Sequence, residues 1–267
     1  MSEDFAILIP ARYASVRYPG KPLALLRGAD GTARSLIQRS WDAARAIAGT
    51  ERVWVATDDA RIADAVRDFG GQVVMTPSSC RNGTERCAAA LEVLGDIAPI
   101  VVNLQGDAPL TPGFVVADLV AALAADPNAA MTTPAVRCSA SLYRHLVTDQ
   151  AAGRVGGTTV VFGRDHRALY FSKRVIPHIP ESRDDAHTHV HLHLGVYAYR
   201  PSALAAYVAA PPAPLEELEG LEQLRFLDMG QTIRMVAFDP LPWDCIELNN
   251  PQDVPAIEAI LRGRGLD

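Results

Sequence analysis

The sequence predicts an α/β protein that has a mostly parallel sheet flanked by helices and a smaller mixed or antiparallel subdomain. In the first half, short apolar runs alternate with helical patterns, which is typical of strand–helix–strand units. These runs are apolar at successive positions, as expected for strands buried on both faces of a parallel sheet. In the second half, several strand-like runs follow one another between loops and turns, which favours antiparallel pairing.

Strands and helices are expected to alternate through the first half. Asp58 or Asp59 can cap the second helix, and Gly70-Gly71 ends it. Asn82, followed by Glu85 three residues later, is the signature of a capping box at the third helix. The strands are expected at residues 5–10, 52–57, 72–75 and 100–105, and the helices at residues 35–48, 58–69, 82–94 and 112–125.

The second half is expected to contain mainly strands, with two helices near its end. The strands fall at residues 131–136, 158–162, 168–172, 192–199 and 232–238, and the helices at residues 216–227 and 254–262. No repeat, low-complexity tract or clear linker interrupts the sequence. We therefore expect one domain over residues 1–267, with a subdomain edge near residues 130–140.

Composition excludes several classes of protein. With a net charge of −6 and a pI near 5.6, the chain has no general attraction for nucleic acid or an anionic membrane, so any anion-binding site must be local. The sequence has neither a signal-peptide pattern nor an apolar run long enough to span a membrane, and we expect a cytoplasmic protein. Its four cysteines form no C-x-x-C pair, which argues against a zinc ribbon or a redox dithiol.

Residues 7–23, ILIPARYASVRYPGKPL, are the most informative part of the chain. A short apolar strand is followed directly by a loop that carries Arg12, Arg17 and Lys21, together with Ser15 and Gly20. Cations and backbone N–H groups at the carboxyl end of a first strand can hold the phosphates of a nucleotide. The alternative is a surface turn with solvated arginines, but the density of cations directly after a buried strand favours the phosphate site.

Lysine usage adds to this interpretation. Of the 25 basic residues other than histidine, only Lys21 and Lys173 are lysines. A lysine carries a compact, rotatable charge, whereas an arginine is a planar five-donor fork. Each lysine is therefore expected where an arginine would not serve.

Two other segments can carry chemistry. Asp107, in Gln105-Gly106-Asp107, follows a predicted strand, and a carboxylate near a phosphate loop suits Mg²⁺; the alternative is an aspartate that stabilises a turn through its own backbone. Asn82 opens a helix whose free N–H groups can satisfy acceptors on a base or phosphate, with Arg86 in reach of a base edge. The alternative there is an ordinary capped helix with a surface arginine.

Four alternating histidines, His187, His189, His191 and His193, would share one face of a strand. Neighbours on that face are about 7 Å apart, whereas zinc needs its ligands about 2.1 Å from a common centre. All four therefore cannot chelate one ion from a regular strand. Contact of one of them with a substrate is the favoured interpretation.

Taken together, the motifs resemble those of a known family, the 3-deoxy-manno-octulosonate cytidylyltransferases, or CMP-Kdo synthetases. The similar segments occur in the same order and span nearly the whole chain: IPARYASVRYPGKPL, ATDD (56–59), NGTERC (82–87), NLQGDAPL (103–110), ALYFSK (168–173), HLGVYAYR (193–200) and PLEELEGLEQLRFL (214–227). The first motif is highly specific to this family and its sugar-acid relatives. The resemblance implies a Rossmann-like fold of the nucleotide-diphospho-sugar transferase type.

The resemblance further implies a homodimer that transfers CMP from CTP to an acidic acceptor, with Mg²⁺ and release of pyrophosphate. Residues of about 1–135 would bind the nucleotide, about 136–240 would bind the acceptor and dimerise, and 241–267 would return to the active site. The implied CTP-binding residues are Arg12, Ser15, Arg17, Lys21, Asn82, Gly83, Arg86 and Gln105; the acceptor-binding residues are Gln105, Lys173, His193, Tyr197, Glu222 and Gln223; the metal ligands are Asp107 and Asn249; and the catalytic residues are Lys21, Arg12 and Asp107.

The chain departs from the family pattern at two places. The usual YFSR is YFSK, which replaces an acceptor-side arginine by Lys173, and the usual V-D-T-P-E-D is LNNPQD, which places Asn249 where the family has a metal-binding aspartate. An amide is a poorer Mg²⁺ ligand than a carboxylate, so Glu247 or Asp244 takes over, or the acceptor itself supplies a ligand.

These departures keep more than one function open. A small, highly charged acceptor such as phosphonoformate would suit a compact cation and could coordinate the metal, so it stands beside a Kdo-like sugar acid. A nucleotidyltransferase for another base is a close alternative. A catalytically inactive nucleotide-binding regulator is the alternative of another class, against which Lys21 and Asp107 argue.

Overall fold

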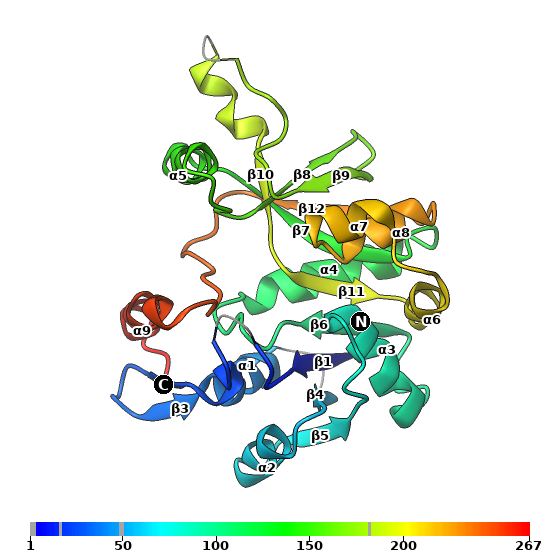
Figure 1. Ribbon diagram of the computed structural model, residues 1–267, viewed down its shortest axis with the longest axis vertical. Helices are drawn as coiled ribbons and strands as arrows, with labels where there is room; N and C mark the ends of the chain where they lie inside the picture. Colours follow the sequence, from blue (N-terminus) through cyan, green and yellow to red (C-terminus); the bar gives the residue numbers. More distant parts are fainter. Residues whose placement is uncertain (1–3, 16–17, 48–50, 181–182) are drawn as a thin grey trace.

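The computed structural model describes residues 4–15, 18–47, 51–180 and 183–267. A large sheet runs through the molecule, and helices cover both of its faces (Figure 1). The strands lie in the order β5-β4-β1-β6-β11-β7-β10-β8-β9, and β12 also pairs with β7. The predicted fold class, a mostly parallel sheet flanked by helices with a mixed, partly antiparallel extension, is confirmed.

The first half forms the parallel part of the sheet. Its strands are β1 (Phe5–Ala11), β4 (Val53–Thr57), β5 (Gln72–Met75) and β6 (Ile100–Leu104), all paired in parallel. Its helices are α1 (Leu36–Arg45), α2 (Ala60–Asp68), α3 (Gly83–Leu94) and α4 (Gly113–Ala125). A separate hairpin joins β2 (Leu25–Arg27) to β3 (Ala33–Ser35). Because parallel strands end at the same edge, the loops after β1 and β6 lie side by side.

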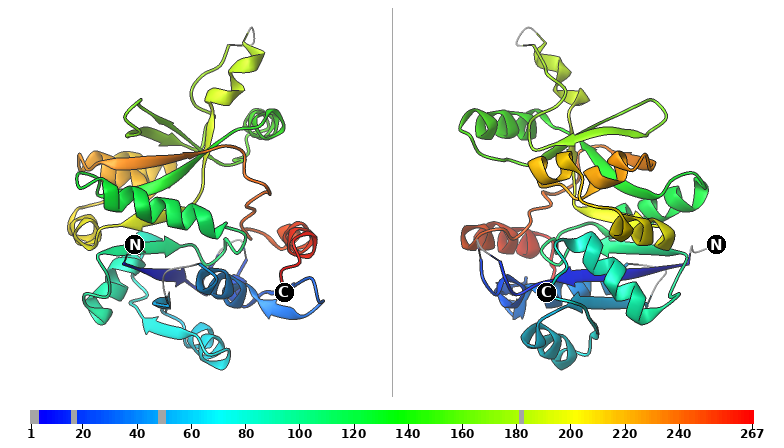
Figure 2. Two further views of the ribbon diagram at one scale, coloured as in Figure 1. Left: turned by 180° about the vertical axis from the view of Figure 1, so that it is seen from behind. Right: turned by 45° about the vertical axis from the view of Figure 1, so that its right-hand side comes forward.

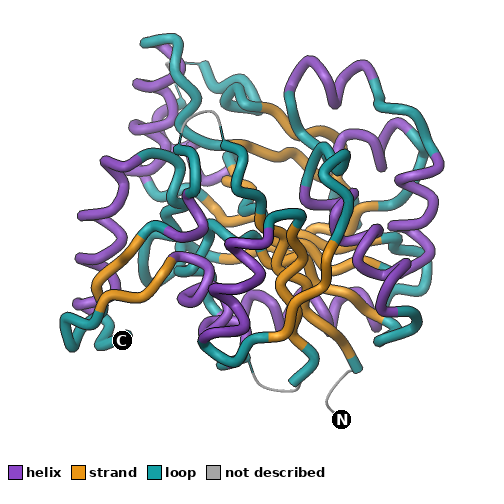
Figure 3. Tube along the Cα trace, turned by 60° about the horizontal axis from the view of Figure 1, so that its bottom comes forward, coloured by secondary structure: helices purple, strands orange, loops and turns teal. Residues whose placement is uncertain are grey.

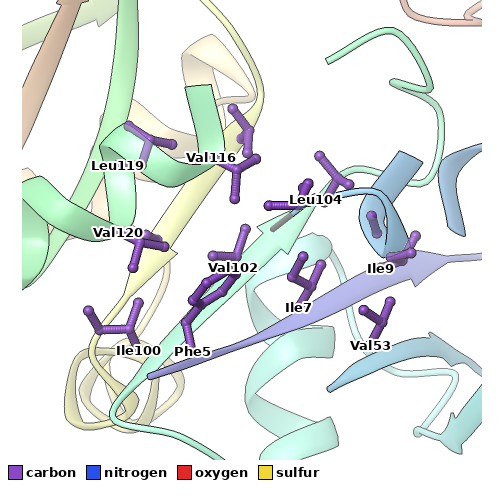
Figure 4. Close-up of a cluster of buried hydrophobic side chains, with 14 of the residues drawn as sticks. Phe5, Ile7, Ile9, Val53, Ile100, Val102, Leu104, Val116, Leu119 and Val120 are labelled. Atoms are coloured by element: carbon purple, nitrogen blue, oxygen red, sulfur yellow. The ribbon is translucent and has the colours of Figure 1, made fainter. Parts of the chain in front are cut away.

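Burial on both faces explains why these strands are apolar at successive positions. All seven residues of β1 are buried. On one face Ile7 and Ile9 join Val102 and Val116 in the cluster shown in Figure 4, whereas Leu8 points into the second core cluster. The strands therefore pass through the middle of the molecule with helices outside them (Figure 3).

The second half extends the sheet with mainly antiparallel strands. They are β7 (Met131–Arg137), β8 (Thr158–Phe162), β9 (Ala168–Ser172), β10 (His191–His193), β11 (Val196–Tyr199) and β12 (Ile233–Phe238), of which β12 runs parallel to β7. The helices are α5 (Ala140–Ala151), α6 (Pro201–Ala209), α7 (Pro214–Glu219), α8 (Gln223–Asp228) and α9 (Val254–Gly263). The last helix packs on the β2–β3 hairpin (Figure 2).

Several expected elements differ in the structure. The strand expected at 192–199 is two strands, because β10 pairs with β7 and β8 whereas β11 crosses to pair with β6. The helix expected at 216–227 breaks at Gly220, whose φ of 60° is left-handed. His187 and His189 lie in a 3₁₀ helix, so the expected alternation of histidines on one strand face is wrong. Helices α5 and α6 were not expected. No helix in the described part of the chain could cross a membrane.

Candidate active site

A cleft of about 640 Å³ opens at the carboxyl ends of β1 and β6. Its walls come from the loop after β1, the start of α3, the loop after β6, the junction of α7 and α8, and the C-terminal segment. The predicted site residues that line it are Arg12, Ser15, Lys21, Asn82, Gly83, Arg86, Gln105, Asp107, Tyr197, Glu222, Gln223 and Asn249. Lys173 and His193 are not among the lining residues, and Arg17 lies outside the described residues.

The loop after β1 brings Lys21 to the loop after β6. Gly20 adopts a left-handed φ of 70°, and its N–H donates to the carbonyl of Tyr13 at 3.0 Å, which closes the loop. A short 3₁₀ helix, Lys21–Leu23, follows. The Nζ of Lys21 lies 2.6 Å from Oδ2 of Asp107, so a cation and a carboxylate from two neighbouring loops meet in the cleft. Arg12 and Ser15 also line the cleft.

The loop around Asp107 is held from several sides. A Cβ on Gly106 would lie 2.9 Å from the carbonyl oxygen of Pro10, so only glycine fits against the end of β1. Ser40 Oγ donates to the carbonyl of Gly106 at 2.9 Å. The N–H of Leu248 donates to the carbonyl of Asp107, also at 2.9 Å, and this bond brings the C-terminal segment into the cleft.

Asp107 and Asn249 are the residues that fit Mg²⁺. Both line the cleft, and both offer hard oxygen donors. The carboxylate of Glu247 lies 3.5 Å from Nδ2 of Asn249. A Cβ on Gly195 would lie 3.3 Å from Oε1 of Glu247. Within the described ranges, no three His, Cys, Asp or Glu residues form a metal cluster. This set fits a Mg²⁺ whose shell is completed by phosphate and water oxygens rather than a metal caged by protein.

The start of α3 forms another wall of the cleft. Asn82 caps the helix, with Oδ1 accepting from the N–H of Glu85 at 2.9 Å. The expected capping box is altered, because the Glu85 carboxylate accepts from the N–H of Arg81 at 2.8 Å. A Cβ on Gly83 would lie 3.2 Å from the side-chain nitrogens of Asn103 and Gln105, so glycine lets the helix start close to β6.

Arg86 is buried rather than exposed. Its guanidinium donates to Thr76 Oγ1 at 2.7 Å and lies 3.1 Å from a carboxylate oxygen of Asp58. The interpretation of Arg86 as a surface arginine is therefore wrong. Asp58 and Thr76 hold a cation at the base of this wall, where it lines the cleft.

Glu222, Gln223 and Tyr197 lie together on the third wall. Glu222 accepts from the N–H of Thr84 at 2.9 Å and from Nε2 of Gln105 at 3.4 Å. Burial raises the pKa of Glu222 above its ordinary value, against the lowering effect of the Thr84 hydrogen bonds. The hydroxyl of Tyr197 donates to Oε1 of Gln223 at 3.4 Å, while the buried Nε2 of Gln223 has no partner among the described residues.

His193 lies behind this wall. Thr133 Oγ1 donates to the carbonyl of Val196 at 2.8 Å, so it accepts from Nε2–H of His193 at 2.9 Å. The imidazole packs edge-on against Phe171 and beside Tyr197. Burial lowers the pKa of His193 to about 3, which keeps the ring neutral.

Lys173 also lies behind the lining residues. Its backbone N–H donates to Oε2 of Glu219 at 3.0 Å. Its Nζ would be 2.9 Å from a Cβ on Gly220, a glycine that does line the cleft. The acceptor-binding roles of Lys173 and His193 stay predictions.

Sequence reasoning missed three residues beside the site. Glu216 and Arg225 line the cleft, and Tyr207 of α6 lies directly behind Asn82, to which it is hydrogen-bonded at 2.9 Å. Arg225 and Tyr207 are almost fully buried. Glu216 and Arg225 lie in the family-like segment PLEELEGLEQLRFL, and Arg225 is a charged residue inside the apolar run LRFL.

The chain is similar to known proteins over nearly its whole length. The family model described as Cytidylyltransferase matches residues 6–233. A 3-deoxy-manno-octulosonate cytidylyltransferase of Maricaulis maris is 44% identical over 258 residues, which are 97% of each chain. One of Chlamydia abortus is 40% identical over 95% of this chain and 92% of its own.

Solved structures give the same picture. A CMP:2-keto-3-deoxy-manno-octonic acid synthetase complexed with CTP superposes with a TM-score of 0.83 at 31% identity, covering 98% of this chain and 100% of that one. A cytidylyltransferase of Leptospira borgpetersenii, at 15% identity and a TM-score of 0.58, covers 96% of this chain and 86% of its own and shares the fold.

Proposed function

Because the chain belongs to the 3-deoxy-manno-octulosonate cytidylyltransferase family and is a nucleotidyltransferase, we propose that it transfers CMP from CTP to an acidic acceptor and releases pyrophosphate. One observation carries the proposal: the Lys21–Asp107 pair shares one cleft with the polar wall of Glu222, Gln223 and Tyr197. A charged phosphate end and a polar acceptor end are what such a transfer requires. The relatives are named for 3-deoxy-manno-octulosonate, so this acid is the first candidate acceptor.

The reaction needs positioning more than covalent chemistry. An acceptor oxygen forms a bond to the α-phosphorus of CTP, and the bond between the α-phosphorus and the bridging oxygen breaks, so that pyrophosphate leaves with the electron pair. Arg12, Ser15 and Lys21 would hold the triphosphate and neutralise the charge that develops on it. Asn82, Gly83 and Arg86 would hold the base.

Mg²⁺ is the proposed cofactor. Asp107 and Asn249 would hold it, and the bound ion would neutralise charge on the triphosphate oxygens. Lys21 would then share Asp107 with the metal, which ties the cation of the first loop to the same carboxylate. Glu247, whose carboxylate lies 3.5 Å from Nδ2 of Asn249, would replace the aspartate that the family pattern has at that position.

Phosphonoformate is a second candidate acceptor. It is favoured by Asn249, an amide in the cleft where the resemblance implies an aspartate, because a charged acceptor could supply the missing metal ligand. Lys173 favours it less than the sequence suggested, because this lysine lies behind Gly220 rather than in the lining.

Pyrophosphate release from CTP and Mg²⁺ tests the proposal, with 3-deoxy-manno-octulosonate and phosphonoformate as parallel acceptors. Faster release with one acid assigns the acceptor, and release with CTP but not with UTP, ATP or GTP assigns the base. If CTP binds but no acid in the panel gives pyrophosphate, the inactive regulator is the better description.

Substitution of Asp107 tests the metal proposal. Asp107→Asn should raise the Mg²⁺ concentration needed for half-maximal activity, and unchanged Mg²⁺ dependence would show that Asp107 is not the main ligand. Homodimer formation and a cytoplasmic location remain predictions for light scattering and cell fractionation.

A further inference from the structure

A buried chain of hydrogen bonds links helix α8 to the cap of α3. Arg225 donates to both carboxylate oxygens of Glu216, through Nε at 2.6 Å and a terminal nitrogen at 2.5 Å. The hydroxyl of Tyr207 donates to Glu216 at 3.0 Å, and Nδ2 of Asn82 donates to that hydroxyl at 2.9 Å. The chain therefore ends on a residue that lines the cleft.

Each bond in this chain has a fixed direction. A guanidinium can only donate, and an ionised carboxylate can only accept. Burial alone would raise the pKa of Glu216, but the hydrogen bonds from Arg225, Ala213 and Tyr207 outweigh it and the pKa is lowered. The Tyr207 hydroxyl must therefore donate its hydrogen bond to Glu216. The hydroxyl oxygen then accepts the hydrogen bond from Nδ2 of Asn82.

The amide of Asn82 is consequently fixed from both sides. Its Oδ1 accepts from the backbone N–H of Glu85, and its Nδ2 donates to Tyr207. Nδ2 carries two protons, so one remains to be offered to the cleft. The amide of Asn82 is thus held in one orientation, and its second Nδ2 proton is a donor that the cleft can use.

We propose that Tyr207, Glu216 and Arg225 are positioning residues that set the preference for cytosine over uracil by fixing the amide of Asn82. This inference rests on the proposed function, in which Asn82 lies at the base. Both bases have an acceptor at O2, but N3 is an acceptor in cytosine and an N–H donor in uracil. A donor held against N3 therefore suits cytosine and opposes the N3–H of uracil.

Burial makes the direction hard to reverse. Arg225 is 1% exposed and Tyr207 is fully buried, so bulk water has little access to the hydrogen bonds that these two side chains make with Glu216. The Arg225 guanidinium also lies over the Tyr207 ring at 3.9 Å, and Phe226 stacks on that ring at 4.9 Å. The ring keeps its place without its hydroxyl, and Tyr207→Phe therefore changes the hydrogen bond alone.

Two substitutions test the proposal through the ratio of kcat/KM for CTP to kcat/KM for UTP. Tyr207→Phe removes the acceptor for Nδ2 of Asn82. Glu216→Gln introduces an amide that can donate to Tyr207, so that the directions of the hydrogen bonds from residue 216 to Asn82 can reverse. One net hydrogen bond corresponds to a change of about 10-fold, and we expect both variants to lower the ratio by about that factor. Both variants should still release pyrophosphate from CTP.

Tyr199→Phe is the matched control. Tyr199 is a buried tyrosine of the same aromatic stack, and its hydroxyl also bonds to α3, at Thr84 Oγ1 (2.9 Å), but not to Asn82. It should lower the melting temperature about as much as Tyr207→Phe and leave the ratio within twofold. An equal fall of the ratio in the control would overturn the inference, because loss of any buried hydroxyl would then suffice.

Asn82→Ala separates this inference from the proposed function. If Asn82→Ala lowers the ratio while Tyr207→Phe and Glu216→Gln do not, the positioning role is wrong and the cytidylyltransferase stands. If Asn82→Ala leaves the ratio unchanged, Asn82 does not read the base and the inference fails. If the wild-type protein releases no pyrophosphate, the proposed function fails, and binding isotherms with CTP and UTP still decide the inference.

Discussion

His193 should make the protein sensitive to mild acid. Its ring is buried, is hydrogen-bonded through Nε2–H to Thr133, and has a pKa of about 3, compared with about 6.5 for an unfolded histidine. At pH values between these two pKa values, His193 is protonated in the unfolded chain but neutral in the folded protein. The stabilisation that this site provides is therefore fully present above pH 6.5 and is lost as the pH falls.

The size of the effect follows from the two pKa values. At pH 7 both states carry a neutral His193, whereas at pH 5 only the unfolded state is protonated. With 1.36 kcal/mol for each pKa unit, the free energy of unfolding should fall by about 2 kcal/mol between pH 7 and pH 5 from this site. His193→Gln keeps a side-chain N–H donor for Thr133 and does not titrate, so it should lack this part of the decrease.

Urea unfolding at pH 7, 6 and 5 measures the difference. The control is His145→Gln, because His145 is 61% exposed in its side chain and should behave as the wild type does. If wild type and His193→Gln lose stability in parallel between pH 7 and pH 5, the buried neutral histidine is not the source of acid sensitivity. The reasoning from burial would then be refuted.

Three other predictions concern the cleft. Lys21→Met should lower kcat/KM for CTP by about 10²–10³ in a pyrophosphate-release assay, because it removes the cation that we propose holds the triphosphate; a loss under tenfold would contradict that role. Burial raises the pKa of Glu222 in the folded protein. As the pH rises from about 4 toward that raised pKa, only the unfolded chain loses the Glu222 proton, so the stability that this site contributes falls. Urea unfolding should show Glu222→Gln gaining stability relative to wild type over that interval, and parallel curves would refute it. Gly83→Ala puts a Cβ 3.2 Å from two amide nitrogens and should raise the KM for CTP several-fold, whereas Gly263→Ala, with open space around it, should leave KM unchanged.

The parallel half of the fold could be predicted because its signals are local. Strands buried on both faces are apolar at successive positions, and the limits expected for β5 are those observed. The Asn82 cap also lies where it was expected. In the second half, the limits of the strands depend instead on the strands with which they pair. The chain at residues 194–195 passes from one set of neighbouring strands to another, and no periodicity within the segment encodes that change.

The candidate site divides in the same way. Lys21 and Asp107 could be predicted to meet, because each follows a strand and parallel topology brings strand ends together. Glu216 and Arg225 could not, because acids and bases on short helices usually lie on a solvated face. Only the packing of α6, α7 and α8 buries them, and that packing depends on residues far along the chain.

Burial of an ion pair is weak evidence for a role in stability, and this gives a further prediction. Replacing a buried pair by apolar residues is often neutral, whereas removing one partner costs about 3–5 kcal/mol. The double variant Glu216→Leu/Arg225→Met should therefore unfold at about the urea concentration of the wild type, while Glu216→Leu alone unfolds much earlier. Both should lose selectivity for CTP over UTP, because Tyr207 no longer has a fixed acceptor. If the double variant kept the wild-type ratio, the pair would serve packing alone and the direction of the hydrogen-bond chain would have no bearing on the choice of base.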